Sequence, residues 1–188
     1  EMKFPEGDAN SQINLAFNYL SLGEPDTAVE HLSTAGALLA EDDWFRWVYT
    51  IRFHAAYAEY WLAKGDPRQA AIAATASLDL AASTRRRKHV AWARKLLGDV
   101  SNMEDRPAHA VEHYRAGLSE LQGHPCPLVE WKIMSALSRT HAVLKNAGDS
   151  QHFRAAARQT LQDLGDSIHE HSQRSRFRNS KAVRDGAA

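Results

Sequence analysis

Apolar residues fall in long stretches that never sustain the strict alternation of a half-buried strand. Short turn segments with Gly, Pro and acidic residues interrupt these stretches at regular intervals. The pattern predicts an all-α chain. The expected helices cover residues 9–22, 25–40, 43–64, 67–82, 85–103, 106–122, 126–147 and 149–164, with a short helix or tail after them.

Three of the turn segments, residues 22–28, 64–70 and 147–153, define an internal repeat. In each, a Gly can take a positive φ at a helix end, and the acidic residue after it can cap the next helix. A fourth segment, residues 104–110, fits with an Asp in the Gly position. The expected turn residues are Gly23, Gly65, Asp105 and Gly148, at steps of 42, 40 and 43 residues.

Small residues flank these turns at fixed distances, as two closely packed helices require. Seven residues before them stand Ala16, Ala58, Gly98 and His141, and five after them stand Ala28, Ala70, Ala110 and Phe153. Three of the four are small at both places. One helix pair cannot bury its apolar face alone, but stacked pairs share a continuous core. We therefore expect about four stacked helix pairs.

The order of small residue, Gly and Ala resembles the tetratricopeptide repeat, through Ala16-Gly23-Ala28, Ala58-Gly65-Ala70 and Gly98-Asp105-Ala110, with His141-Gly148-Phe153 diverging most. The step exceeds the usual repeat of about 34 residues. That longer form resembles the C-terminal helical arrays of bacterial LuxR-type ATP-binding regulators and multidomain nucleotide cyclases. Residues 166–184 resemble the segment that closes those arrays. The resemblance implies a right-handed α-solenoid acting as a sensor or docking module of a larger signalling or transcription-regulatory protein.

Short linkers predict a single domain over residues 1–188. Residues 1–8 would be a linker or a foreign leader, 9–165 the repeats, and 166–188 a capping helix and tail. The chain starts with Glu1 instead of Met, so we interpret it as a processed chain or an excised piece.

Composition narrows the classes of function. The 23 basic and 23 acidic residues balance, which argues against a nucleic-acid partner. The single cysteine, Cys126, excludes an internal disulfide and a multi-cysteine metal site, and it fits a reducing, cytoplasmic location. No apolar stretch approaches the ~18–20 residues of a membrane span, so no membrane partner is expected.

His109-x-x-Glu112-His113 spells a zinc-protease motif, in which two histidines on one helix face bind the metal and the Glu acts as base. The Ala-Val-Glu-His part recurs at residues 28–31 without the first His, so we interpret it as an element of the repeat. His169-Glu170-His171 alternates along a helix and does not share a face. We expect no metal, no cofactor and no enzymatic activity.

Three further features favour a structural interpretation. The basic run at residues 85–89 lies at a helix start, where it is expected to be a solvated turn. Cys126 has no activating base fixed by sequence. The five tryptophans fall in the first helices of the pairs and are expected mainly in the core. Trp44 and Trp47, three residues apart, are the pair best placed to form an interaction patch.

In the tetratricopeptide family the ligand lies in a concave groove lined by the first helix of each pair. Carrying these positions over predicts a groove formed by Asn14, Phe17, Arg52, Glu59, Trp92, Lys95, Asp99, Asn102, Arg139 and Lys145. Some members clamp a C-terminal carboxylate with Lys and Asn, but here Asp99 and Arg139 stand where Asn would be needed. The mixed polar groove still suits an extended or helical peptide.

The leading hypothesis is a non-enzymatic scaffold that binds a protein or peptide partner in this groove. The alternative is a self-association module, in which an uncovered end repeat stacks on a second copy. A metal-dependent hydrolase using His109, Glu112 and His113 is the remote alternative.

Overall fold

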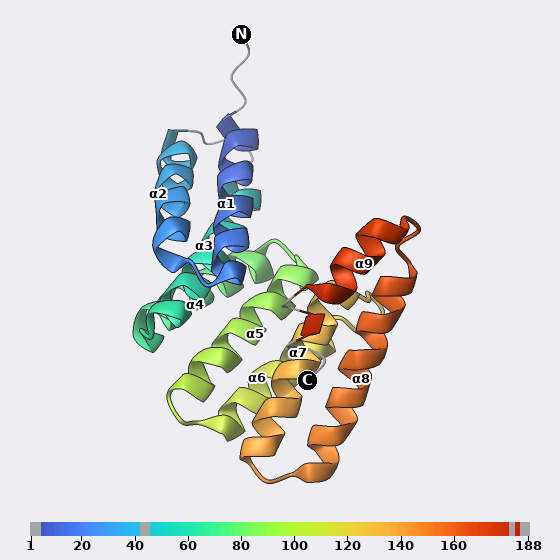
Figure 1. Cartoon of the computed structure of the whole chain (residues 1–188). Helices are drawn as coiled ribbons and strands as arrows, with labels where there is room; N and C mark the ends of the chain where they lie inside the picture. Colours follow the sequence, from blue (N-terminus) through green and yellow to red (C-terminus); the bar gives the residue numbers. More distant parts are fainter. Residues whose placement is uncertain (1–4, 42–45, 181–182, 185–188) are drawn as a thin grey trace.

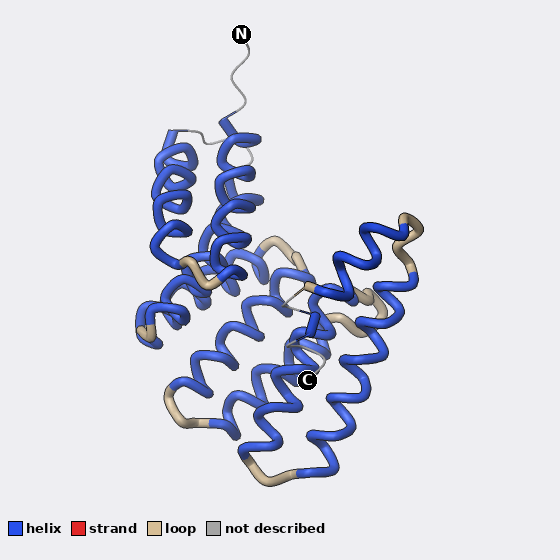
Figure 2. Tube along the Cα trace, viewed as in Figure 1, coloured by secondary structure: helices blue, strands red, loops and turns tan. Residues whose placement is uncertain are grey.

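The computed structural model describes residues 5–41, 46–180 and 183–184, which form helices and connecting turns without any strand (Figures 1 and 2). This confirms the all-α prediction. The helices are α1 (Pro5–Leu22), α2 (Pro25–Glu41), α3 (Arg46–Lys64), α4 (Pro67–Ser83), α5 (Arg87–Met103), α6 (Pro107–Glu120), α7 (Pro127–Val143), α8 (Ala147–Asp166) and α9 (His171–Asn179).

The first eight helices form four hairpins, α1–α2, α3–α4, α5–α6 and α7–α8, stacked into a solenoid-like array (Figure 1). Each helix packs against the next along the chain. The first helices also pack side by side, α1 on α3, α3 on α5 and α5 on α7. They therefore make one continuous layer, while α9 packs on α8 as the expected short closing helix. Within the described ranges, none of the helices is both long and apolar enough to cross a bilayer.

The turns inside the hairpins share one backbone geometry, each around a residue with positive φ that we call the turn residue. In the second hairpin the Gly65 N–H donates to the Leu62 carbonyl at 3.1 Å, and the Asp66 N–H donates to the Trp61 carbonyl at 2.9 Å. This pair of bonds is the Schellman motif, which satisfies the last carbonyls of a helix. The four turn residues are Gly23 (81°), Gly65 (75°), Asp105 (56°) and Lys145 (60°).

The expected fourth turn residue, Gly148, is wrong by three positions. Helix α8 begins at Ala147, so Gly148 lies in its first turn, and Lys145 adopts the left-handed conformation instead. The Lys145 N–H donates to the Ala142 carbonyl at 3.1 Å, as in the other turns. The steps between turn residues become 42, 40 and 40 residues. The repeat is thus more regular than the glycines alone indicated.

The corrected register also corrects the small-residue pair of the fourth hairpin. His141 and Phe153 do not occupy those places; their rings stack on one another, with centroids 5.6 Å apart. The places belong to Ser138 and Ser150, both buried, and the Ser138 hydroxyl donates to the Ser150 carbonyl at 2.9 Å. All four hairpins therefore join their helices through a pair of small buried residues.

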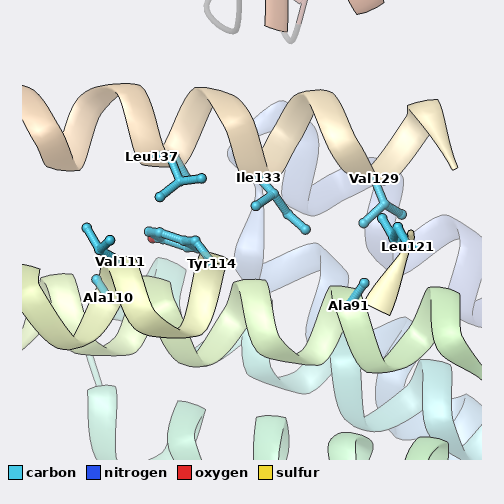
Figure 3. Close-up of a cluster of buried hydrophobic side chains, with 9 residues drawn as sticks. Ala91, Ala110, Val111, Tyr114, Leu121, Val129, Ile133 and Leu137 are labelled. Carbon is cyan, nitrogen blue, oxygen red and sulfur yellow. The ribbon is translucent and has the colours of Figure 1, made fainter. Parts of the chain in front are cut away.

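Counted by its buried members in the described residues, the largest apolar cluster lies between α5, α6 and α7, around the fully buried Tyr114 (Figure 3). Figure 3 shows its ring between Val111 and Leu137. A methyl group on Gly98 would overlap this ring, so the third hairpin needs glycine at its small position. The Tyr114 hydroxyl donates to Asp99 at 2.7 Å, which links the core to the exposed face of α5.

Candidate functional site

Two rows of residues on the first helix of each hairpin (α1, α3, α5 and α7) line a groove. Relative to each turn residue they stand thirteen and six positions earlier, two helical turns apart and hence on one face. The first row is Asn10, Arg52, Trp92 and Lys132. The second row is Phe17, Glu59, Asp99 and Arg139. All but Asn10 line one of two adjacent hollows.

The larger hollow, about 360 Å³, is called here the central hollow. Its charged lining is Glu59, Lys95, Asp99, Lys132 and Arg139, and its apolar lining is Leu20, Leu62, Ala63, Trp92 and Trp131. The smaller one, about 210 Å³, is called the basic hollow. Its ionisable lining is Arg52, Lys88, His89 and Lys132, and its apolar lining is Phe17, Ala55, Trp92, Leu128 and Val129.

Trp92 and Lys132 belong to both hollows and form the ridge between them. The Lys132 ammonium lies 4.6 Å from the centre of the Trp92 ring, and the Lys95 ammonium lies 5.1 Å from it. Cation–π attraction of this kind is worth about 0.5–1 kcal/mol or more per contact when partly desolvated. Trp92 therefore holds both lysines over the groove without neutralising their charge.

Asp99 is already satisfied by its neighbours. Lys95 Nζ lies 2.6 Å from one carboxylate oxygen, and the Tyr114 hydroxyl donates to the other. Asn102 extends this network, because its amide donates to Tyr114 Oη at 3.0 Å and to Thr140 Oγ1 at 2.8 Å. This network fixes α5 against α6 and α7, so Asp99 and Asn102 act mainly in positioning.

Glu59 is the unsatisfied group of the central hollow. The Trp92 indole N–H donates to its carboxylate, but Oε1 is buried and has no hydrogen-bond partner in the described part of the chain. Burial raises the pKa of Glu59, and the nearby Lys95 and Lys132 only partly oppose that rise. A buried acceptor without a donor costs about 1–3 kcal/mol, so Glu59 lowers the stability of the fold at this place.

In the basic hollow, neutral amide side chains orient the guanidinium of Arg52. The Arg52 guanidinium donates to the side-chain oxygens of Asn10 and, at 2.6 Å, of Asn14. Amide acceptors fix the guanidinium but leave its charge intact. Burial, helped by the charges of Lys88, Arg52 and Arg86, lowers the pKa of His89 to about 4. With this pKa the imidazole is neutral at pH 7, first because it is buried and second because cations surround it.

Most of the predicted groove residues are brought together. Phe17, Arg52, Glu59, Trp92, Lys95, Asp99 and Arg139 line the hollows, while Asn14 orients Arg52 and Asn102 ties three helices together. Lys145 lies elsewhere. It is the turn residue of the fourth hairpin and lines a separate hollow with Ser150 and Arg154 of α8. The three-residue error in the register put it in the predicted groove.

The sequence-based prediction missed Lys132, Lys88, His89 and Leu128. Lys132 falls at the position of Trp92 only when the step is kept at 40 residues, and that constancy was the available signal. Lys88 and His89 belong to the basic run that was expected to be solvated. The run divides at the α4–α5 corner: Arg85 and Arg87 line a different hollow with Asp79 and Glu120.

The two histidine motifs that could suggest a metal site lie on a helix surface or at a helix start. His109 Nδ1 lies 3.5 Å from Glu112 Oε2, and both side chains are mostly exposed, at 63% and 76%. The described residues hold no cluster of three His, Cys, Asp or Glu side chains suited to a metal ion. Glu170 caps α9 by accepting from the backbone of Ser172 and Gln173.

Cys126 and the tryptophan pair also have structural surroundings. Cys126 is half-buried against the largest apolar cluster at the start of α7, and its N–H donates to Glu130 Oε1 at 2.9 Å. Trp47 is 36% exposed, with the Arg86 guanidinium 4.8 Å from its ring centre. Trp44, its proposed companion, lies outside the described residues.

No protein-family model matches the chain, and a search of the curated proteins finds no match either.

Proposed function

We propose that the chain is a non-enzymatic scaffold that binds a segment of another protein along the face of α1, α3, α5 and α7. The observation that supports this best is the pair of joined hollows over Trp92 and Lys132, which gather Glu59 and the cations Arg52, Lys88 and Lys132. Among the described residues, none of these three cations forms a salt bridge, and Glu59 Oε1 has no hydrogen-bond partner. Charges that serve only folding are expected to be paired when they are partly buried. Here partners for them would come from a ligand.

The dimensions suit side chains of a peptide. Hollows of about 210 and 360 Å³ sit next to one another along the groove, and each can hold one or two side chains. Their lining mixes charged groups with two tryptophans, a combination typical of surfaces whose few anchors dominate binding energy.

The repeat residues support a tetratricopeptide-like assignment, because small buried pairs and left-handed turn residues recur at steps of 40 to 42 residues. That resemblance in turn supports a role as the regulatory or sensor module of a larger bacterial signalling or transcription-regulatory protein. Such a module would act by shape and charge complementarity, without chemistry of its own.

An unbiased peptide library, displayed on phage and selected against the purified chain, tests the proposal. Selected peptides are expected to bind with micromolar affinity and to lose about tenfold in affinity to the Arg139→Ala variant. The matched control is Arg68→Ala, which removes another exposed arginine, from α4 and outside both hollows. Both substitutions are at exposed sites, so each variant should keep the circular-dichroism spectrum of the parent.

Failure of the library to yield any binder, or equal losses with Arg139→Ala and Arg68→Ala, would reject the groove as the binding site. The library contains acidic, basic and neutral peptides alike, so this result does not depend on the chemistry of the ligand.

A further inference from the structure

We propose that the basic hollow receives the carboxylate of an acidic side chain on the bound segment, while a large apolar side chain of that segment packs beside it on Trp92 and Leu128. This inference rests on the proposed groove function and specifies its partner as an acidic, partly apolar peptide. The supporting observations are the charge of the hollow, a lining that contains no carboxylate, and its exposed apolar wall.

Three cations face the basic hollow, and no carboxylate lines it. Arg52 comes from α3, Lys88 from α5 and Lys132 from α7, so three successive hairpins contribute one each. Among the described residues, no salt bridge joins any of the three to an acidic side chain. Glu59, which lines the neighbouring central hollow, attracts Lys132, but it is one carboxylate beside three cations. In a chain whose net charge is zero, a local positive excess therefore remains for an external anion to neutralise.

Arg52 is already oriented for such a contact. Asn10 and Asn14 hold its guanidinium from one side, which lowers the entropy cost of binding a carboxylate. His89 lies among the same cations: burial lowers its pKa most, and the charges of Lys88, Arg52 and Arg86 lower it further. A neutral imidazole can still donate one hydrogen bond.

The wall of the hollow supplies the apolar half of the recognition. Leu128 is 58% exposed in the first turn of α7, and Phe17 and Trp92 lie against the same space. An exposed leucine of this kind beside three cations gives a surface on which an acidic residue and an adjacent leucine or phenylalanine both find partners.

The neighbouring hollow favours a peptide over a nucleic acid. Glu59 and Asp99 line the continuation of the groove beyond Trp92, so a second and third phosphate along a polyanion would meet carboxylates. A peptide that carries one or two acidic residues avoids this repulsion.

Fluorescence anisotropy with three labelled peptides of about 12 residues tests the inference. Each has Gly-Ser flanks around a core, which is Leu-Glu-Glu-Phe, its glutamine isostere Leu-Gln-Gln-Phe, or Leu-Lys-Lys-Phe. The acidic peptide is expected to bind the full chain at least about tenfold more tightly than the glutamine peptide at about 50 mM salt, and the difference should shrink at about 500 mM.

The adjacent residues Lys88 and Arg87 provide the matched variants. Both are exposed in the first turn of α5, but Lys88 faces the basic hollow and Arg87 faces the hollow on the other side. Lys88→Gln is expected to weaken the acidic peptide about fivefold to tenfold, and Arg87→Gln to leave it unchanged. Lys132→Gln should behave like Lys88→Gln.

Several outcomes would overturn the inference. Equal affinities for the acidic and glutamine peptides, or equal effects of Lys88→Gln and Arg87→Gln, would show that the basic hollow does not select a carboxylate. Tighter binding of a labelled single-stranded oligonucleotide than of the acidic peptide would assign the cations to phosphates instead. If the library selection yields groove binders without acidic residues, the proposed function stands and this inference fails.

Discussion

At the residue level, the buried carboxyl of Glu59 lines the central hollow and also affects the stability of the fold. Its buried Oε1 lacks a partner, and burial raises its pKa above the ordinary value of 4.5. A carboxyl group whose pKa is higher in the folded than in the unfolded chain stays protonated in the folded state at a pH where the unfolded state has already ionised. The buried carboxyl therefore destabilises the folded chain most at pH values above its raised pKa, where it is ionised in both the folded and the unfolded state.

Glu59→Gln is predicted to stabilise the chain at neutral pH by about 1 kcal/mol, because it removes a buried charge but keeps a side chain that can accept from Trp92. Below the unfolded-state pKa of about 4.5 the carboxyl is protonated in both states, so the gain should vanish there. Urea unfolding of both proteins between about pH 4 and pH 8 measures this dependence.

Glu112→Gln is the control for that measurement. Its carboxylate is 76% exposed on α6, so a surface substitution there should change stability by less than about 0.5 kcal/mol at every pH. A stability difference for Glu59→Gln that is the same at pH 4 and pH 8, or a loss at pH 7, would contradict the interpretation of Glu59 as a buried acceptor with a raised pKa.

At the level of elements, the four hairpin turns show which local signals decide a fold. Gly65 is a turn residue with φ of 75°, whereas Gly148 lies in the first turn of α8 with open space around its Cα. Both stand in similar Gly-Asp sequences. Only the hydrogen bonds of the completed hairpin distinguish them.

The same substitution is therefore predicted to have opposite effects at the two glycines. Gly65→Ala forces a Cβ into the left-handed region and should destabilise the chain by about 1 kcal/mol. Gly148→Ala should be neutral or stabilise it by up to about 1 kcal/mol, because alanine favours a helix. Thermal unfolding of the two variants beside the parent checks this, and a loss at Gly148 as large as at Gly65 would restore the register first predicted.

The helices and three of the turn residues could be predicted from sequence, because breakers and small residues recur at nearly constant steps. The fourth turn could not, because Lys145 takes a left-handed conformation that costs an ordinary residue about 1–2 kcal/mol, and its two turn hydrogen bonds offset that cost. A nearby glycine gave the stronger local signal.

The register of each hairpin also decided which groove residues could be predicted. Arg52, Glu59 and Trp92 were predicted because their hairpins were in the right register, while Lys132 was missed because its hairpin was shifted by three residues. Lys88 and His89 were visible as a basic run, but which side of a helix corner faces a groove depends on tertiary packing. Local sequence contains no signal for that choice.

At the scale of the whole molecule, the array should not be equally stable along its length. Helix α5 packs against α3, α4, α6 and α7, and the largest apolar cluster lies beside it. Among the described residues, the hairpin α1–α2 packs mainly against α3, and α9 has no buried residue. In a stacked array each unit is stabilised mainly by its neighbours, so the ends are expected to open first.

Hydrogen–deuterium exchange is predicted to show this gradient, with the slowest amides in α5 and α7, faster ones in α1 and α2, and the fastest in α9. Saturating acidic peptide should add protection to α3, α5 and α7, the helices that contribute Arg52, Lys88 and Lys132, and should leave α4 and α6 little changed. Uniform protection over all helices would mean that the chain opens as one cooperative unit. New protection confined to α4 and α6 would place the ligand on the opposite layer, because those helices contribute none of the residues that line the two hollows.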